Sequence, residues 1–190
     1  MRILIVSDAW HPQVNGVVRT LINTVDQLVA MGHEVEVIGP DRFRSLPCPT
    51  YPEIRLALLP RSGVVAAIDR FGPDAIHLAT EGPLGSAARA LCLERGYAFT
   101  TAYHTQFPEY VQARARIPLA WTYAMLRRFH APSKAVMVAT PSLDRTLETR
   151  GFRNLRRWSR GVDLELFRPG RKDLYGDPRP ILLYAGRVAV

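Results

Sequence analysis

The chain has 190 residues, of which 47% are hydrophobic and 22% charged, a composition typical of one globular domain with a sizeable core. No apolar run approaches the ~20 residues that a membrane-spanning helix needs, and the first one, residues 2–6, is too short for a signal peptide. The net charge of +8 favours an anionic partner: a nucleotide diphosphate, an anionic lipid surface or nucleic acid. Nucleic acid ranks last, because the basic residues are scattered and no basic run has interleaved aromatics. We therefore expect no nucleic-acid partner and a cytoplasmic protein, with peripheral contact to the inner face of the cell membrane as a further option.

Apolar runs and amphipathic stretches alternate along the chain. Residues 2–6 predict a buried strand, residues 17–31 place their apolar side chains on one helical face, and residues 34–40 predict a second strand. Such a unit contains two parallel strands joined by a right-handed crossover. The pattern then repeats, with strands expected over 54–60, 73–80, 97–104, 135–141 and 154–161. Helices are expected over 62–71, 83–96, most of 108–130 with an interruption near Pro118, and 142–151, the last with Ser142 as its N-cap. This alternation predicts an α/β fold, a doubly wound parallel sheet of the Rossmann-like kind that is covered on both faces.

The end of the chain differs in composition. Residues 161–180 hold glycines and prolines that disfavour regular structure, and we expect them to form an interdomain linker. Residues 181–190 predict the first strand of another domain, with no helix after it to cover it. We therefore expect a truncated chain, in which residues 1–160 form the Rossmann-like domain and only the start of a second domain follows.

Ligands of parallel α/β sheets bind outside the carboxyl ends of the strands, and polar loops follow several of the predicted strands. The first loop, DAWHPQVNG, ends with Asn15 and Gly16 at the start of a helix, where backbone N–H groups and the positive helix end can bind an anion. It lacks the G-x-G-x-x-G pattern of a dinucleotide site. The alternative is that Asn15 only caps the helix and Gly16 only permits the turn.

Two further loops carry groups suited to acid–base chemistry. Glu81 follows the strand at 73–80 and could act as a general base or bind a hydroxyl, or it could be an acid that the helix dipole favours. His104 ends the strand at 97–104 and could share a hydrogen bond with a substrate hydroxyl, although a lone histidine is more often structural. No His/Cys/Asp cluster has the spacing of a metal site, so we expect no metal.

Residues 107–130 combine aromatic and basic side chains, including Trp121, Arg127 and Arg128. A basic, aromatic, amphipathic helix can lie at an anionic membrane surface, where an acceptor would also be found. An ordinary helix that packs its aromatic residues on the sheet and leaves its arginines in water explains the same pattern.

Six motifs occur in a recognisable order: SDAWHPQVNGVVRTL, HLATEGPLG, AYHTQFPEY, ATPSL, SRGVDLELFRPG and LLYAGRV. In this order the chain resembles the N-terminal half of a GT-B glycosyltransferase of family 4. It is most similar to the GDP-mannose-dependent α-mannosyltransferases, with the sulfoquinovosyl- and glucosyl-diacylglycerol synthases as neighbours. The resemblance implies two Rossmann-like domains that face each other across a cleft. It also implies transfer of a hexose, with mannose favoured, from a nucleotide-diphosphate sugar to a lipid or glycan acceptor, with retention of configuration and without a cofactor or required metal.

The resemblance further implies roles for individual positions. Asn15-Gly16 matches the loop that approaches the donor phosphates, and His104 matches the histidine that contacts the donor sugar near its anomeric carbon. Glu81 falls in the loop that lines the acceptor site, and we expect it to take part in catalysis together with His104. Gly186-Arg187 matches the Gly-Arg pair that opens the second domain, where the arginine neutralises the leaving diphosphate. The lysine and the glutamate pair that the family places later would lie beyond residue 190, so we expect this chain alone to bind a nucleotide-sugar poorly.

Two other functions stay open at this point. A stand-alone, non-catalytic Rossmann-like binding module would have the same fold. A nicotinamide- or SAM-dependent enzyme is disfavoured, because the glycine fingerprint is missing and Gly39-Pro40 offers no acid for a ribose at the end of the second strand.

Overall fold

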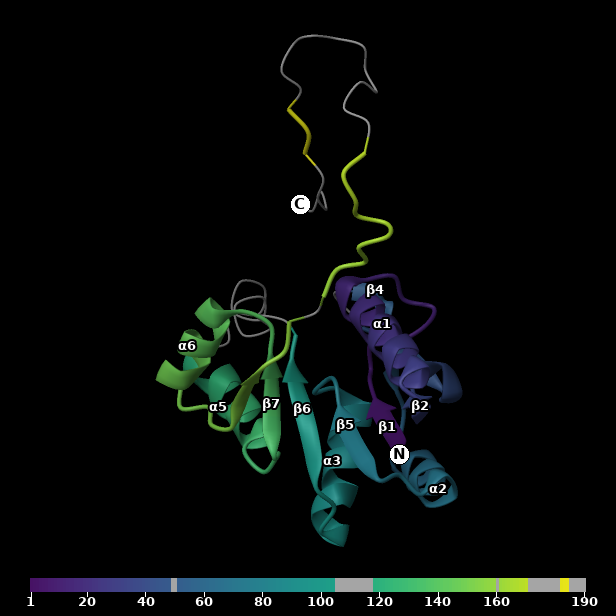
Figure 1. The fold of residues 1–190 in the computed structure, drawn as a ribbon. Helices are drawn as coiled ribbons and strands as arrows, with labels where there is room; N and C mark the ends of the chain where they lie inside the picture. The colour runs from purple at the N-terminus through teal and green to yellow at the C-terminus, as the bar shows by residue number, and fades with distance from the viewer. Residues whose placement is uncertain (49–50, 105–117, 160, 171–181, 185–190) are drawn as a thin grey trace. The chain divides into compact units, whose positions relative to one another are not determined.

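The computed structural model describes residues 1–48, 51–104, 118–159, 161–170 and 182–184, without the side chains of residues 51–53. The chain divides into two compact units, Met1–Arg160 and Gly161–Val190. The first unit holds a central sheet with flanking helices (Figure 1). No helix within the described ranges is long and apolar enough to cross a membrane.

Six parallel strands form the central sheet, in the order β2-β1-β5-β6-β7-β8. Their bounds are Arg2–Val6 (β1), Glu34–Ile38 (β2), Ala75–Leu78 (β5), Phe99–Tyr103 (β6), Ala135–Val138 (β7) and Leu155–Arg157 (β8). Each strand pairs in parallel with its neighbours. The prediction of a parallel, Rossmann-like α/β sheet is therefore confirmed.

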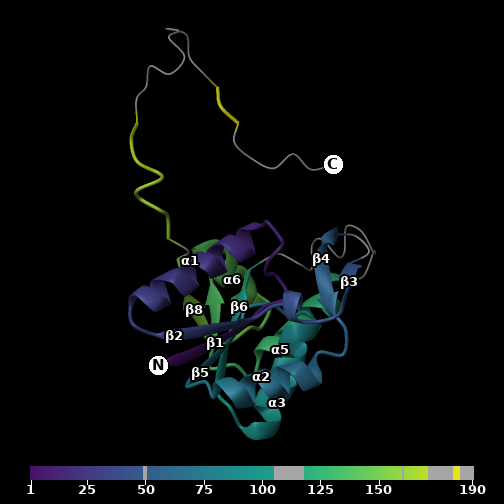
Figure 2. The same ribbon diagram turned by 90° about the vertical axis from the view of Figure 1, so that its right-hand side faces the viewer.

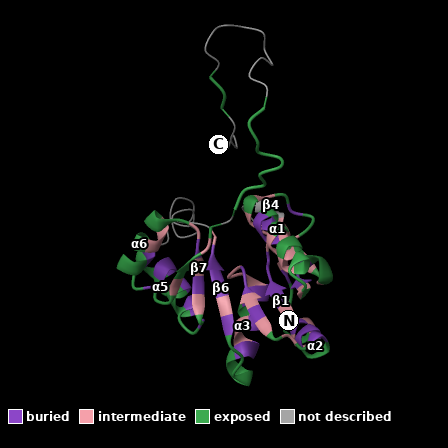
Figure 3. Ribbon diagram, in the orientation of Figure 1, coloured by how far each residue is buried: buried purple, intermediate pink, exposed green. Residues whose placement is uncertain are grey.

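Helices flank both faces of this sheet, but unevenly. They are α1 (Gly16–Ala30), α2 (Arg61–Phe71), α3 (Pro83–Arg95), α5 (Leu119–His130) and α6 (Pro141–Thr149). α1 packs against Ile5 and Val37 on one face. On the other face α2 and α3 pack against Leu4, and α5 and α6 pack against Val136. Figure 2 shows α1 on one side of β1 and β2 with α2 and α3 on the other, and Figure 3 shows how buried residues concentrate on the strands.

The register of the strands aligns apolar side chains across the sheet. Leu4 pairs with Ile76, Ile76 pairs with Phe99, and all three are buried. Burial of each such side chain contributes about 1.5–3 kcal/mol to stability. Because the three strands are parallel and in register, the carboxyl ends of β1, β5 and β6 lie side by side at one edge of the sheet.

The segment between β2 and α2 differs from the prediction. The sequence predicts a strand of the main sheet over 54–60, but β4 (Tyr51–Ala57) pairs antiparallel with β3 (Ser45–Cys48) in a separate two-stranded sheet. A short 3-10 helix, η1 (Pro40–Arg42), precedes this hairpin. Only residues 49–50 connect β3 to β4, and so short a connection can join antiparallel strands but not parallel ones. The prolines in and around these strands also disfavour a place inside a sheet.

The start of α6 also differs from the prediction. The N-cap is Thr140, whose hydroxyl accepts a hydrogen bond from the backbone N–H of Leu143 at 3.3 Å, and Ser142 lies inside the first turn. The reason is Pro141, which favours the first helical position because it has no N–H to leave unpaired. The residue before the proline therefore becomes the cap.

The second unit is described at residues 161–170 and 182–184, where the structure records no helix or strand. One turn is present, in which the Asp163 carboxylate accepts hydrogen bonds from the backbone N–H groups of Glu165 (3.0 Å) and Leu166 (2.9 Å). The linker over 161–180 and the strand over 181–190 stay predictions, because most of their residues lie outside the described part.

Candidate functional site

Asp8 joins the end of β1 to the start of α3. Its carboxylate accepts hydrogen bonds from the backbone N–H groups of Leu84 (2.9 Å) and Gly85 (3.3 Å) and from the Thr80 hydroxyl (2.9 Å). The N-cap residue of α3, Gly82, has no side chain that could cap the helix. The Asp8 carboxylate, from the loop after β1, therefore accepts hydrogen bonds from the first free N–H groups of the helix. Burial raises the pKa of the Asp8 carboxyl, and the three hydrogen bonds oppose that shift.

Two glycines allow α3 to approach Asp8 so closely. A Cβ atom on Gly82 would lie 2.5 Å from Cγ of Asp8, and a Cβ atom on Gly85 would overlap the carbonyl oxygen of Thr80. A larger residue at either position would therefore push the helix away from the carboxylate. The motif EGPLG thus specifies a close helix start in addition to carrying Glu81.

Hydrogen bonds also connect Asp8 to the predicted donor loop. Gln13 Nε2 donates to the Asp8 carbonyl oxygen (2.9 Å), and Asn15 Nδ2 donates to Gln13 Oε1 (3.2 Å). Asn15 Oδ1 accepts from two backbone N–H groups in the first turn of α1, each at 3.0 Å, so Asn15 is the N-cap of this helix. Gly16 is exposed, with open space where a Cβ would be. An anion at this helix start would therefore meet the backbone at Gly16, because the Asn15 side chain is already engaged.

Glu81 is held by a histidine that the sequence did not predict. Its Oε1 atom lies 3.1 Å from Nε2 of His130, whose Nδ1 atom lies 2.8 Å from the Thr101 hydroxyl. The His130 side chain is almost completely buried among three aromatic rings, whereas the Glu81 side chain is 29% exposed. Glu81 is not an acid of the first helical turn, because α3 begins at Pro83. The carboxylate that binds the first turn of α3 belongs to Asp8. Glu81 is therefore a fixed carboxylate that still reaches solvent.

His104 lies directly after β6 and is half-buried. Its ring contacts the ring of Trp158 at a centroid distance of 5.7 Å, and the Trp158 ring also contacts the ring of His77 at 5.9 Å. His77 Nδ1 lies 2.8 Å from the Thr100 hydroxyl, and burial lowers the pKa of His77 to about 4. His77 is thus a neutral residue of the sheet, and His104 is the histidine that lies at the strand end.

The predicted residues of this edge follow adjacent strands, with Asn15 after β1, Glu81 after β5 and His104 after β6. These groups are an exposed helix start, a carboxylate and an imidazole. A helix start suits a phosphate, and the two side chains suit hydroxyl groups. Among the described residues no group of three His, Cys, Asp or Glu side chains could hold a metal ion. Gly186-Arg187, the other predicted donor residues, lie outside the described part of the chain.

α5 carries the residues predicted to contact a membrane or an acceptor. Trp121 is 74% exposed, Met125 is 57% exposed, and Arg128 is exposed one turn further along, so the three share one face. The opposite face buries Tyr123 against the sheet side of the domain. The Arg127 guanidinium donates to the carbonyl oxygen of Arg150 (3.0 Å) and so helps to fix the end of α5. The helix therefore has one ordinary packed face and one apolar-basic face in water.

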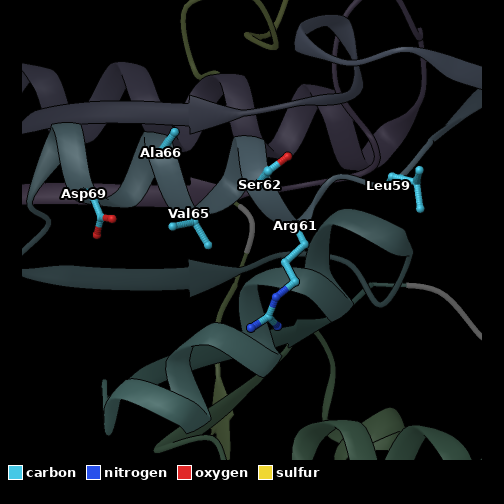
Figure 4. Close-up of a pocket in the computed structure, with 6 residues that line it drawn as sticks. All are labelled: Leu59, Arg61, Ser62, Val65, Ala66 and Asp69. Atoms are coloured by element: carbon cyan, nitrogen blue, oxygen red, sulfur yellow. The ribbon is translucent and has the colours of Figure 1, made fainter.

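A hollow on the surface of α2 offers no comparable chemistry (Figure 4). Its lining residues are Leu59, Arg61, Ser62, Val65, Ala66 and Asp69. The two charged residues are already paired, because Arg61 binds Glu94 at 2.7 Å and Asp69 binds Arg95. We therefore assign no function to this hollow.

The fold defines the class of protein: a Rossmann-like α/β domain with a helix start, a carboxylate and an imidazole at the carboxyl ends of adjacent strands. Residues 14–166 match the model of Glycosyltransferase Family 4. The chain belongs to this family, as its motifs predict.

Individual proteins that are similar in sequence extend this comparison. The chain is 28% identical to a GDP-mannose-dependent alpha-mannosyltransferase of Mycolicibacterium smegmatis, over 100% of this chain and 57% of that protein. It is 27% identical to the sulfoquinovosyl transferase SQD2 of Arabidopsis thaliana, over 98% of this chain and 42% of that protein. The chain thus spans about half the length of the curated relatives it matches.

A solved structure shares the fold. Sucrose-phosphate synthase from Thermosynechococcus elongatus superimposes with a TM-score of 0.61 at 16% identity, over 89% of this chain and 50% of that chain. At this identity the likeness concerns the fold alone.

Proposed function

We propose that the full-length protein is a retaining glycosyltransferase that moves a hexose from a nucleotide-diphosphate sugar to a lipid or glycan acceptor. The family match over residues 14–166 carries this proposal. Three relatives are named GDP-mannose-dependent alpha-mannosyltransferases, which favours GDP-mannose as the donor. Another relative is named alpha-monoglucosyldiacylglycerol synthase, which favours a lipid among the acceptors.

The start of α1 is the proposed contact for the donor diphosphate. Asn15 fixes the first turn, and the exposed backbone at Gly16 then faces the phosphates with the positive end of the helix behind it. Gly186-Arg187 would add a cation that neutralises the leaving diphosphate. The proposal includes no metal and no cofactor, because charge on the leaving group is balanced by these groups.

His104 and Glu81 are the proposed catalytic residues. His104, supported by the ring of Trp158, would bind the donor sugar near the carbon that reacts. Glu81 would accept a hydrogen bond from an acceptor hydroxyl, and His130 would keep its carboxylate in position. Asp8 fixes the start of α3 directly after Glu81, so little ordering of this loop would be needed when substrates bind.

The test is an assay of the full-length protein with GDP-mannose, UDP-glucose and UDP-galactose, each with a lipid extract and with oligosaccharides. We expect transfer from GDP-mannose, with the anomeric configuration of the product retained in its NMR spectrum. His104→Ala should lower kcat by about 100-fold or more. His33 lies just before β2 and away from this edge. The kcat of His33→Ala should therefore stay within about twofold of the wild-type value, because a surface substitution far from the reacting groups has little effect.

Three outcomes would contradict parts of this proposal. An inverted product would refute retention. Binding of GDP in calorimetry without transfer to any acceptor would favour the non-catalytic binding module. Binding of NAD without binding of any nucleotide diphosphate would refute the proposed function as a whole.

We also propose that the exposed face of α5 contacts an anionic membrane from the cytoplasmic side, where a lipid acceptor would be found. Trp121 would lie at the headgroup level and the arginines would face the lipid charge. Arg127→Glu with Arg128→Glu should weaken binding to phosphatidylglycerol vesicles in co-sedimentation. Arg19→Glu with Arg145→Glu makes the same charge change on other helices, and an equal loss in both proteins would refute a specific contact through α5. No nucleic-acid partner is proposed.

A further inference from the structure

Positive charge is concentrated in one half of the first unit. Residues 1–104 contain nine arginines against ten Asp and Glu, whereas residues 118–159 contain eight Arg and Lys against two Asp and Glu. The second stretch forms α5, β7, α6 and β8. The basic character of the protein therefore resides mainly in this half of the sheet.

The arginines of the two halves also differ in their partners. Five arginines of the first stretch form ion pairs with carboxylates: Arg2, Arg42, Arg61, Arg70 and Arg95. Within the described residues, no arginine of 118–159 forms such a pair. In the described part of the chain, no carboxylate therefore balances the charges of these arginines.

Three of these arginines line one pocket. Arg127 and Arg128 come from the end of α5, and Arg153 comes from the segment between α6 and β8. The pocket has a volume of about 470 Å³, and the buried ring of Phe152 forms part of its lining. Pockets of about 300–1,000 Å³ accept small molecules, so the space is sufficient for a phosphorylated group.

Neutral backbone groups hold the cations around this pocket in place. Arg127 donates to the Arg150 carbonyl oxygen, and Arg89 of α3 donates to the carbonyl oxygens of Phe129 and Arg128, both at 2.8 Å. Burial and the neighbouring charge of Arg128 lower the pKa of Arg89. Like charges thus stand close together, and a bound anion would relieve their repulsion.

We propose that this pocket binds a phosphate group, with Arg128 and Arg153 as its main ligands. Two guanidinium groups from separate segments can each donate two parallel hydrogen bonds to phosphate oxygens, a geometry that lysine cannot provide. The phosphate could belong to a soluble metabolite or to a lipid headgroup, since both present the same oxygens. The pocket lies where β7 and β8 begin, while Asn15, Glu81 and His104 follow the ends of strands. His130, which contacts Glu81, also lines the pocket, so the pocket lies next to Glu81 but does not include the proposed donor contact at Gly16. The proposal does not depend on glycosyl transfer.

The test measures phosphate binding at residues 151–154 of the full chain. Inorganic phosphate is titrated while the backbone amide signals of these residues are followed by NMR, and binding to phosphatidylcholine vesicles with and without phosphatidic acid is measured separately. Arg128→Gln and Arg153→Gln are the site variants, and thermal unfolding shows whether they fold. Arg145→Gln is the matched control, because it removes one charge from the same half but lies on the exposed surface of α6, outside the pocket.

We expect each site variant to weaken binding by about tenfold, because the charge-assisted hydrogen bonds of one guanidinium would be lost. The control should bind as the wild type does. Saturable shifts with inorganic phosphate would identify a soluble ligand. Binding only to vesicles with phosphatidic acid, sensitive to the site variants, would identify a headgroup. An equal loss in Arg145→Gln would show a general charge effect and overturn the proposal. Binding to neither probe would overturn it as well.

Discussion

Two buried polar residues, Asp8 and His130, hold the loops of the candidate site. Asp8 accepts a hydrogen bond from the first turn of a helix 76 residues later in the chain, and His130 fixes Glu81 from 49 residues away. Asn15 and Glu81 could be predicted, because a polar loop after an apolar strand is recognisable within a few residues. The roles of Asp8 and His130 could not be predicted, because they depend on partners that only the folded chain brings close.

At the scale of single residues, His77 should make stability depend on pH. Its pKa is lowered from 6.5 to about 4 in the folded protein, so the unfolded chain binds more protons between these values. The contribution of neutral His77 to the free energy of unfolding is fully present above about pH 6.5. It is lost as the pH falls toward 4, by about 3 kcal/mol in total. Urea denaturation at several pH values between 7 and 4 would measure this loss.

His77→Leu should remove most of that pH dependence, since no imidazole would then need to take up a proton. His11→Leu, which changes an exposed histidine of the first loop, should keep the pH dependence of the wild type. If His77→Leu loses as much stability on acidification as the wild type does, another group is responsible.

At the scale of elements, the pattern of apolar residues was sufficient for the six strands of the main sheet and for the described helices. The strand expected at 54–60 was assigned to the wrong sheet and β3 was not predicted, because an apolar run does not reveal which strand it pairs with. Pairing was decided by the two-residue connection and the prolines. The pattern of apolar residues therefore predicts where a strand lies better than it predicts which strand it pairs with.

The start of α6 allows a direct test of such a local decision. Thr140→Ala should destabilise the protein by about 1 kcal/mol, because the Leu143 N–H would lose its cap. Ser142→Ala should cost less than about 0.5 kcal/mol, as an exposed residue inside the first turn. Chemical denaturation of both variants decides the matter, and a larger loss for Ser142→Ala would assign the cap to the serine.

At the scale of the whole molecule, the division after Arg160 should govern proteolysis. Leu164, Leu166 and Phe167 are each at least 60% exposed and lie outside any helix or strand, which makes them suitable for thermolysin. Brief digestion should therefore cut first beyond Arg160 and release a fragment close to Met1–Arg160, as measured by mass spectrometry. Leu59 is the competing site, because it is 92% exposed before α2, and a first cut there would contradict the prediction.

The place of β1 between β2 and β5 has a consequence for synthesis of the protein. Residues 2–6 are made before both partner strands, and one edge of β1 can pair as soon as residues 34–38 follow. The other edge must wait for residues 75–78, because β5 is its partner there. Until then the nascent chain presents an apolar strand with an open row of backbone donors and acceptors, the kind of edge on which other chains aggregate. This strand is thus exposed to wrong partners until residues 75–78 have been made.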